Sequence, residues 1–130
     1  MKVTKKVLEK NARKFLTRHD YDFIAFESKR KPYYAVAKDS NKDLHFIIID
    51  YIKGKEKSKG LDCAFDKLED KIDRKDIEQR AIKYLIENKM LDECRIYLDT
   101  LYFYVIGEDS AFLRHHIGYG LKGEKTNDRI

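Results

Sequence analysis

One stretch of the chain combines a buried strand, a carboxylate and a row of lysines. Residues 44–51 include five large apolar residues, three of them consecutive isoleucines, which predicts a strand buried on both faces. Asp50 stands near its end, and the loop at 53–60 follows, bounded by glycines. A carboxylate beside a basic loop could serve metal-assisted phosphodiester chemistry, since Mg²⁺ takes oxygen ligands. The strand itself supplies few such ligands.

A metal site would therefore need carboxylates from elsewhere. Glu9, Asp50 and Asp62 are the residues that could form a displaced site. The alternative, which we favour, is that Asp50 is a strand-end charge that faces solvent or pairs with a lysine. We therefore predict no metal site and no cofactor.

The four histidines offer little more. His115 and His116 are adjacent and would point to opposite sides of a strand. His45 is expected to be a partly exposed residue at the edge of the core, and neither it nor His19 is expected to lie near the pair.

Basic residues are the stronger signal. The predicted nucleic-acid contacts are Lys29, Arg30, Lys31, Lys53, Lys55, Lys57 and Lys59. Two loops at one end of a sheet would join these residues into a rim that neutralises phosphates without reading base sequence. The alternative is a solvated loop that keeps the sheet edge soluble.

Aromatic residues crowd the last long strand, at 97 and 102–104. They could anchor a protein partner or a second copy of the chain. The alternative, which we favour, is that they fill the core against helices.

The hydrophobic pattern predicts the elements that hold these residues. We expect helices at 3–19, 62–72 and 74–88, strands at 21–27, 33–37, 44–52 and 95–106, and a short strand or helical turn at 111–119. Short turns make the first three strands an antiparallel meander. A helical crossover leads to the next strand, so we predict an α/β fold with a mixed sheet.

Composition limits the class of protein. The chain has 130 residues and a formal net charge of +5, which predicts one domain over 1–121 and a flexible tail over 122–130. The chain has two cysteines and no pattern typical of a signal peptide, so we expect a reducing, cytoplasmic setting. No apolar run approaches the roughly 20 residues of a membrane helix, and we expect no membrane partner.

Several stretches resemble the YraN-like family of small bacterial predicted endonucleases, within the PD-(D/E)xK superfamily. The matching residues are Glu9, Ala12 and Phe15-Leu16 of the first helix, the strands at 31–37 and 44–50, the helix end at 81–85, and Leu98-Asp99. The resemblance implies a restriction-endonuclease-like fold.

The family's catalytic residues are mostly absent at these positions. Of its carboxylates only Glu9 is retained; Tyr34 and Ile48 replace the other two, and Asp50 replaces the lysine. The resemblance therefore implies a catalytically degenerate nuclease that binds DNA or RNA without sequence specificity. A protein-interaction module and an active metal-dependent endonuclease with a displaced site are the alternatives.

Overall fold

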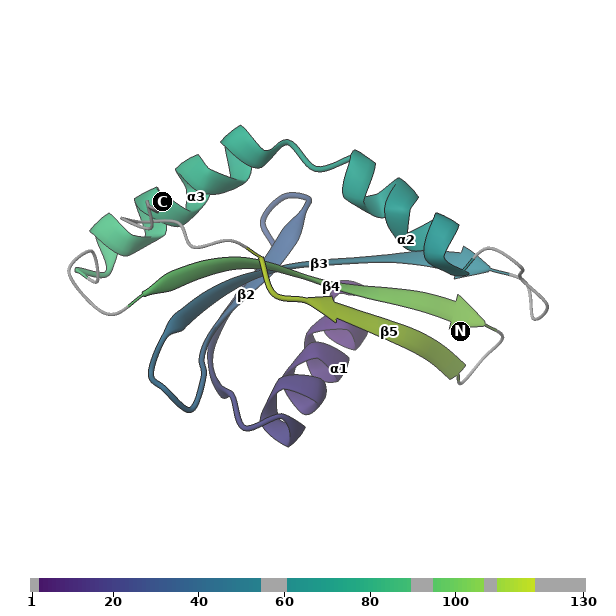
Figure 1. Cartoon of the computed structure of the whole chain (residues 1–130), viewed down its shortest axis with the longest axis horizontal. Coiled ribbons are helices and arrows are strands. Elements are labelled where there is room, and N and C mark those ends of the chain that lie inside the picture. The colour runs from purple at the N-terminus through teal and green to yellow at the C-terminus, as the bar shows by residue number, and fades with distance from the viewer. Residues whose placement is uncertain (1–2, 55–60, 90–94, 107–109, 119–130) are drawn as a thin grey trace, which may run out of the picture.

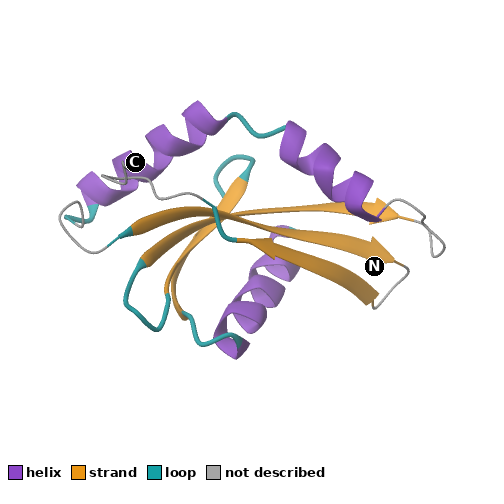
Figure 2. Ribbon diagram, viewed as in Figure 1, coloured by secondary structure: helices purple, strands orange, loops and turns teal. Residues whose placement is uncertain are grey.

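The computed structural model describes residues 3–54, 61–89, 95–106 and 110–118, which form a sheet between two layers of helices (Figure 1). The helices are α1 (Lys5–Arg18), α2 (Leu61–Asp70) and α3 (Arg74–Glu87). The strands are β1 (Asp22–Glu27), β2 (Tyr33–Lys38), β3 (Leu44–Gly54), β4 (Ile96–Ile106) and β5 (Ser110–His116). Figure 2 shows α1 against one face of the sheet, and α2 and α3 arching over the other.

The sheet has five strands in the order β1-β2-β3-β4-β5. The first three form an antiparallel meander. The α2–α3 crossover then returns the chain to β4, which runs parallel to β3. The predicted α/β class, meander and mixed sheet are thus confirmed. The final element, for which the sequence left two alternatives, is a strand antiparallel to β4.

The first helix begins where a side chain can cap it. The Thr4 hydroxyl accepts the N–H of Val7 at 3.2 Å, which satisfies a donor that the first turn leaves unpaired. Leu8, Ala12 and Leu16 recur at four-residue spacing and are buried against the sheet. That apolar stripe joins α1 to alternate residues of β2, β3 and β4.

The second layer is two helices rather than one. The expected join near Asp73 is confirmed, because the Asp73 carboxylate accepts the N–H of Asp76 at 3.2 Å and caps α3. Ile77, Ala81 and Leu85 of α3 pack on the even-numbered residues of β2, β3 and β4. The sheet therefore carries a separate core cluster on each face.

The third strand is longer than the hydrophobic pattern indicates. It continues to Gly54, so Lys53 and Gly54 belong to the sheet and not to the basic loop. A side chain at Gly54 would collide with the Tyr104 ring, which is buried under α2. Glycine therefore lets β3 pair with β4 along its whole length. The predicted tail at 122–130 lies outside the described residues.

Candidate functional site

The residues singled out by the family resemblance do not all converge. Tyr34 and Ile48 face each other across β2 and β3, and Asp50 follows two residues later. Alternate residues of a strand share a face, so Ile48 and Asp50 lie on the same face of β3. That face packs toward α2 and α3. Glu9 lies on α1, under the opposite face, and pairs with Arg13 at 3.5 Å. The sheet separates Glu9 from the other three.

Asp50 lines an open hollow of about 550 Å³ at the end of β3. Three lysines from different parts of the chain line it as well: Lys31 before β2, Lys53 in β3 and Lys71 after α2. One carboxylate among three ammonium groups leaves the hollow net positive. Such a surface attracts anions rather than divalent cations.

The turn that carries Lys29, Arg30 and Lys31 is held by α3. The Arg80 guanidinium donates to the Pro32 carbonyl at 2.8 Å and to the Arg30 carbonyl at 3.4 Å. Arg30 in turn donates to the Asp76 carboxylate at 2.9 Å, and this hydrogen bond raises the pKa of Arg30 and lowers that of Asp76.

The predicted basic rim is therefore only partly assembled from described residues. Lys31 and Lys53 line the same hollow, and Lys71 joins them although sequence reasoning did not select it. Lys29 lines a neighbouring hollow on the α3 side. The positive charge of Arg30 is compensated by the Asp76 carboxylate. The remaining three, Lys55, Lys57 and Lys59, lie outside the described residues.

Sequence reasoning missed a second cluster, on the α1 face of the sheet. The His45 side chain lies between two carboxylates, with Nδ1 at 2.6 Å from Asp99 and Nε2 at 2.8 Å from Asp39. His115 Nε2 contacts the same Asp99 oxygen at 3.1 Å. The Gly118 N–H donates to the other Asp99 oxygen at 3.2 Å. Asp99 therefore ties β3, β4 and β5 together.

Two expectations about the histidines were thus wrong. His45 is 1% exposed rather than partly exposed, since Tyr21 and Tyr97 pack on its ring at centroid distances of 5.1 and 4.9 Å. It also lies near His115, because parallel pairing of β3 with β4 and antiparallel pairing of β4 with β5 bring both rings to Asp99.

The electrostatics of this cluster follow from its geometry. Both ring nitrogens of His45 face carboxylate oxygens, so both donate and the ring is an imidazolium. Burial alone would lower the pKa of His45, but the hydrogen bonds and charges of Asp99 and Asp39 outweigh it and raise that pKa above 6.5. Burial disfavours the ionised form of Asp99 and alone would raise its pKa, but hydrogen bonds from His115 and His45 outweigh burial and bring that pKa below 3.8.

The cluster is built to hold strands rather than to exchange protons with a substrate. With both nitrogens of His45 engaged, that ring has no lone pair for an external group. Asp39 sits in the β2–β3 turn, where its other oxygen accepts the N–H groups of Asn41 and Asp43 at 2.8 and 3.0 Å. His45 therefore links this turn to Asp99, in the first half of β4.

A polar residue inside an apolar run was the available signal for this cluster. His45 lies between Leu44 and Phe46, and Asp99 follows Leu98 in a strand rich in apolar residues. A buried charge needs a partner. The sequence gives no indication of which partner, because 54 residues separate the two.

Three of the four aromatic residues predicted on the last long strand, β4, fill the core, as we favoured. Tyr102, Phe103 and Tyr104 are at most 4% exposed. Tyr102 donates its hydroxyl to Glu69 of α2 at 3.1 Å, and burial together with the Glu69 carboxylate raises its pKa. Tyr97 is half-buried and stacks on His45 at a centroid distance of 4.9 Å.

Neither a metal cluster nor a membrane-spanning helix is found among the residues described. No group of three or more histidine, cysteine, aspartate or glutamate side chains in those ranges is placed to hold a metal ion. Over the same ranges, no helix has both the length and the apolar character to cross a bilayer. Comparison with known proteins gave no match to a family model, a curated protein or a solved structure.

Proposed function

We propose that this protein is a restriction-endonuclease-like domain that binds nucleic acid through its phosphate backbone and does not cleave it. The hollow at the end of β3 is the contact surface. The observation that carries the proposal is the meeting of Lys31, Lys53 and Lys71, from three separate parts of the chain, around one open concavity.

The order of elements supports the fold assignment. A first helix, an antiparallel meander, a helical crossover and a strand parallel to the third are the arrangement that the YraN-like resemblance implies. Tyr34 and Ile48 occupy positions where that family carries carboxylates, and they are 8% and 2% exposed within an apolar cluster. An apolar cluster there favours binding without Mg²⁺-assisted cleavage.

The charge of the hollow predicts how binding depends on salt. Each phosphate neutralised on duplex DNA contributes a slope of about −0.9 to the logarithm of affinity against the logarithm of salt. Three lysine contacts then give a slope of about −2.7 and a roughly 40-fold loss of affinity between 50 and 200 mM salt. Lysine ammonium groups contact backbone phosphates rather than base edges, so little sequence preference is expected.

The test is fluorescence anisotropy with labelled duplex DNA, single-stranded DNA and RNA across this salt range. The triple variant Lys31→Glu, Lys53→Glu, Lys71→Glu should abolish binding. The matched control is Lys5→Glu, Lys6→Glu, Lys10→Glu on α1, which makes the same change in net charge on the opposite face.

Each outcome decides one part of the proposal. An equal loss of affinity in both triple variants would mean that net charge, and not the hollow, governs binding. Absence of binding at low salt would reject a nucleic-acid ligand altogether. Cleavage that depends on Mg²⁺ or Mn²⁺ and disappears in Asp50→Ala would replace a binding protein by an active nuclease with a displaced site.

A further inference from the structure

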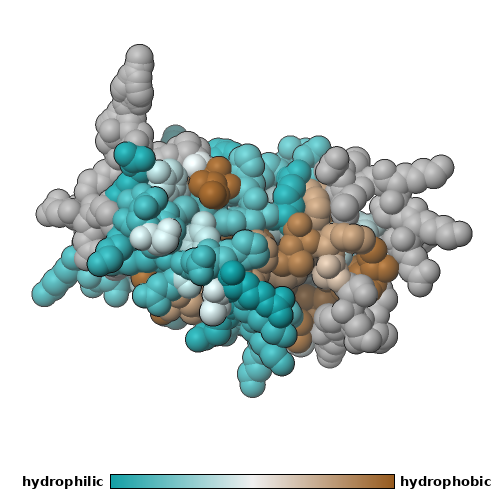
Figure 3. Space-filling model, turned by 60° about the horizontal axis from the view of Figure 1, so that its bottom comes forward, coloured by the Kyte–Doolittle hydropathy of each residue, from teal (hydrophilic) through white to brown (hydrophobic). Residues whose placement is uncertain are grey.

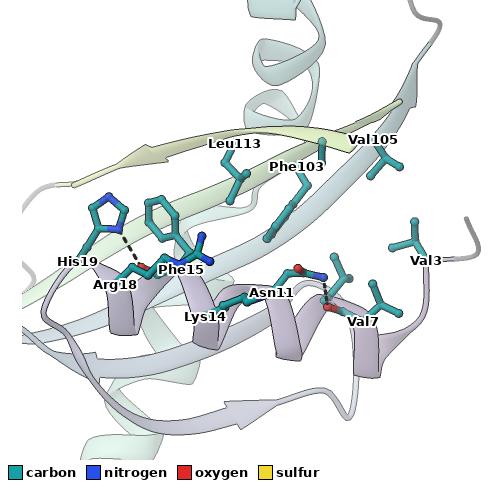
Figure 4. Close-up of a pocket in the computed structure, with 12 residues that line it drawn as sticks. Val3, Val7, Asn11, Lys14, Phe15, Arg18, His19, Phe103, Val105 and Leu113 are labelled. Carbon is teal, nitrogen blue, oxygen red and sulfur yellow. Dashed lines mark hydrogen bonds between the residues drawn. The ribbon is translucent and has the colours of Figure 1, made fainter. Parts of the chain in front are cut away.

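A groove on the α1 face belongs neither to the lysine hollow nor to the histidine cluster. It runs between α1 and the strands β4 and β5, and it encloses about 260 Å³. Figure 4 shows its lining residues pointing into the space from the helix below and the strands above. Its walls are mainly apolar, formed by Val7, Phe15, Phe103, Val105 and Leu113.

The two ends of this groove differ in chemistry. Val3, Val7 and Val105 line one end, Lys14 lies nearer the middle of the groove, and Arg18 stands toward the other end (Figure 4). On the molecular surface, hydrophobic residues gather in a patch beside a broad hydrophilic region (Figure 3). The groove is therefore amphipathic along its length, with its positive charge away from the valine end.

The aromatic wall next to Arg18 is held by its own contacts. Phe15 stacks on His19 at a centroid distance of 4.1 Å and meets the edge of His115 at 5.7 Å. His19 Nδ1 lies 2.8 Å from the Phe15 carbonyl oxygen, to which it donates. A wall that is ordered before binding lowers the entropic cost of taking up a ligand.

We propose that this groove binds a free medium-chain monocarboxylate, with the alkyl chain along the valines and the carboxylate near Lys14 and Arg18. The volume lies just below the roughly 300–1,000 Å³ of sites for drug-sized ligands, so a slender molecule fits better than a bulky one. Lys14 and Arg18, both away from the valine end, select a single negative charge on the ligand. The groove lies on the face opposite Asp50, so this inference is independent of nucleic-acid binding.

The charge also argues against a second copy of the chain as the occupant. α1 carries Lys5, Lys6, Lys10, Arg13, Lys14 and Arg18 against one acidic residue, Glu9. Two copies meeting across β5 would bring two such helices toward one shared cleft. Like charges there would oppose association, whereas a carboxylate ligand would relieve the excess charge.

The experiment uses octanoate as the probe, with the full chain labelled at its Val and Leu methyl groups for NMR. Octanoate should shift the methyl signals of Val7, Val105 and Leu113 saturably, with a Kd between about 10 μM and 1 mM, as the small size of the ligand allows. Octan-1-ol and octyltrimethylammonium have the same chain with no charge and with a positive charge. They should bind at least about fivefold more weakly.

Two variants and one control locate the site. Arg18→Glu should weaken octanoate binding at least about fivefold, because it places a carboxylate beside the ligand's own. Lys6→Glu makes the same charge change outside the groove lining and should leave the Kd unchanged. Leu113→Glu should abolish binding, and since Leu113 is 41% exposed the amide spectrum should remain that of the folded protein.

The opposite results would overturn the inference. One such result is the absence of saturable methyl shifts up to about 10 mM octanoate, a range that covers weak ligands. Another is an affinity for octyltrimethylammonium equal to that for octanoate. Binding only to vesicles of anionic phospholipid, and not to free octanoate, would mean that the patch contacts a membrane surface instead. Formation of a dimer that Leu113→Glu disrupts, without octanoate binding, would assign the groove to a second copy.

Discussion

The sharpest prediction concerns His45, the buried imidazolium between Asp39 and Asp99. In His45→Phe the ring keeps roughly its volume between Tyr21 and Tyr97 but loses both N–H donors. Each hydrogen bond to a charged group contributes about 1.5–3 kcal/mol. Losing both should therefore lower the free energy of unfolding by at most about 3–6 kcal/mol.

The expected loss lies in the lower part of that range. Asp99 keeps its hydrogen bonds from His115 and Gly118, and Asp39 keeps those from Asn41 and Asp43. We therefore expect His45→Phe to lower the free energy of unfolding by about 3–4 kcal/mol, in line with losing one member of a buried ion pair. For a domain of this size, that corresponds to a drop in Tm of about 10 °C.

The loss should depend on pH in a defined direction. The pKa of His45 is raised above 6.5, so its contribution is complete below about 6.5 and declines as the pH rises through the folded-state value. The pKa values of Asp99 and Asp39 are lowered below 3.8, against the effect of burial, by the hydrogen bonds of their histidine partners and, for Asp39, backbone N–H groups. Their contribution is present above about 3.8 and is lost as the pH falls through the folded-state values.

Urea unfolding of wild type and His45→Phe, followed by circular dichroism from pH 3 to 9, provides the measurement. The difference in stability should be largest between about pH 4 and 6.5 and should shrink on both sides. His19→Phe is the control, because His19 is exposed on the surface and its ring donates to the Phe15 carbonyl oxygen of its own helix. A loss below about 1 kcal/mol at pH 6, the value of one neutral hydrogen bond, or a difference that does not change with pH, would refute the reasoning.

Three further predictions each concern a single residue. Gly118→Ala should destabilise the protein by about 2 kcal/mol or more in a thermal melt, since its Cβ would strike the Leu98 carbonyl oxygen and displace the N–H that bonds Asp99; an unchanged Tm would contradict this. Burial and then the charges of Asp99 and Asp39 raise the pKa of Tyr21 to about 12, so an NMR titration of its ring should give that midpoint, and Asp99→Asn should lower it. Asp73→Ala should cost about 1 kcal/mol through loss of the α3 cap, whereas the exposed Lys75→Ala should leave the urea midpoint almost unchanged.

Local patterns were enough to predict most of the architecture. The four-residue spacing of Leu8, Ala12 and Leu16 indicated α1, and the apolar run from Leu44 indicated β3, because periodicity and side-chain type act over a few residues. The order of elements then indicated the meander, the crossover and the mixed sheet. The pattern failed at local boundaries, as at Gly54, where pairing with β4 and the position of Tyr104 extend the strand.

The candidate sites depended on contacts that no local pattern contains. Strand pairing across 54 residues joins His45 to Asp99, and packing of three separate parts of the chain brings Lys71 to Lys31 and Lys53. The amphipathic groove likewise exists only because α1 lies beneath β4 and β5. Residue types and spacing indicate which side chains can carry a charge or fill a core. Whether a side chain is buried, and which residue it interacts with, depends on the assembled sheet. Those properties convert a histidine expected to be partly exposed into a buried imidazolium and leave Glu9 on the wrong face for the site that its spacing suggested.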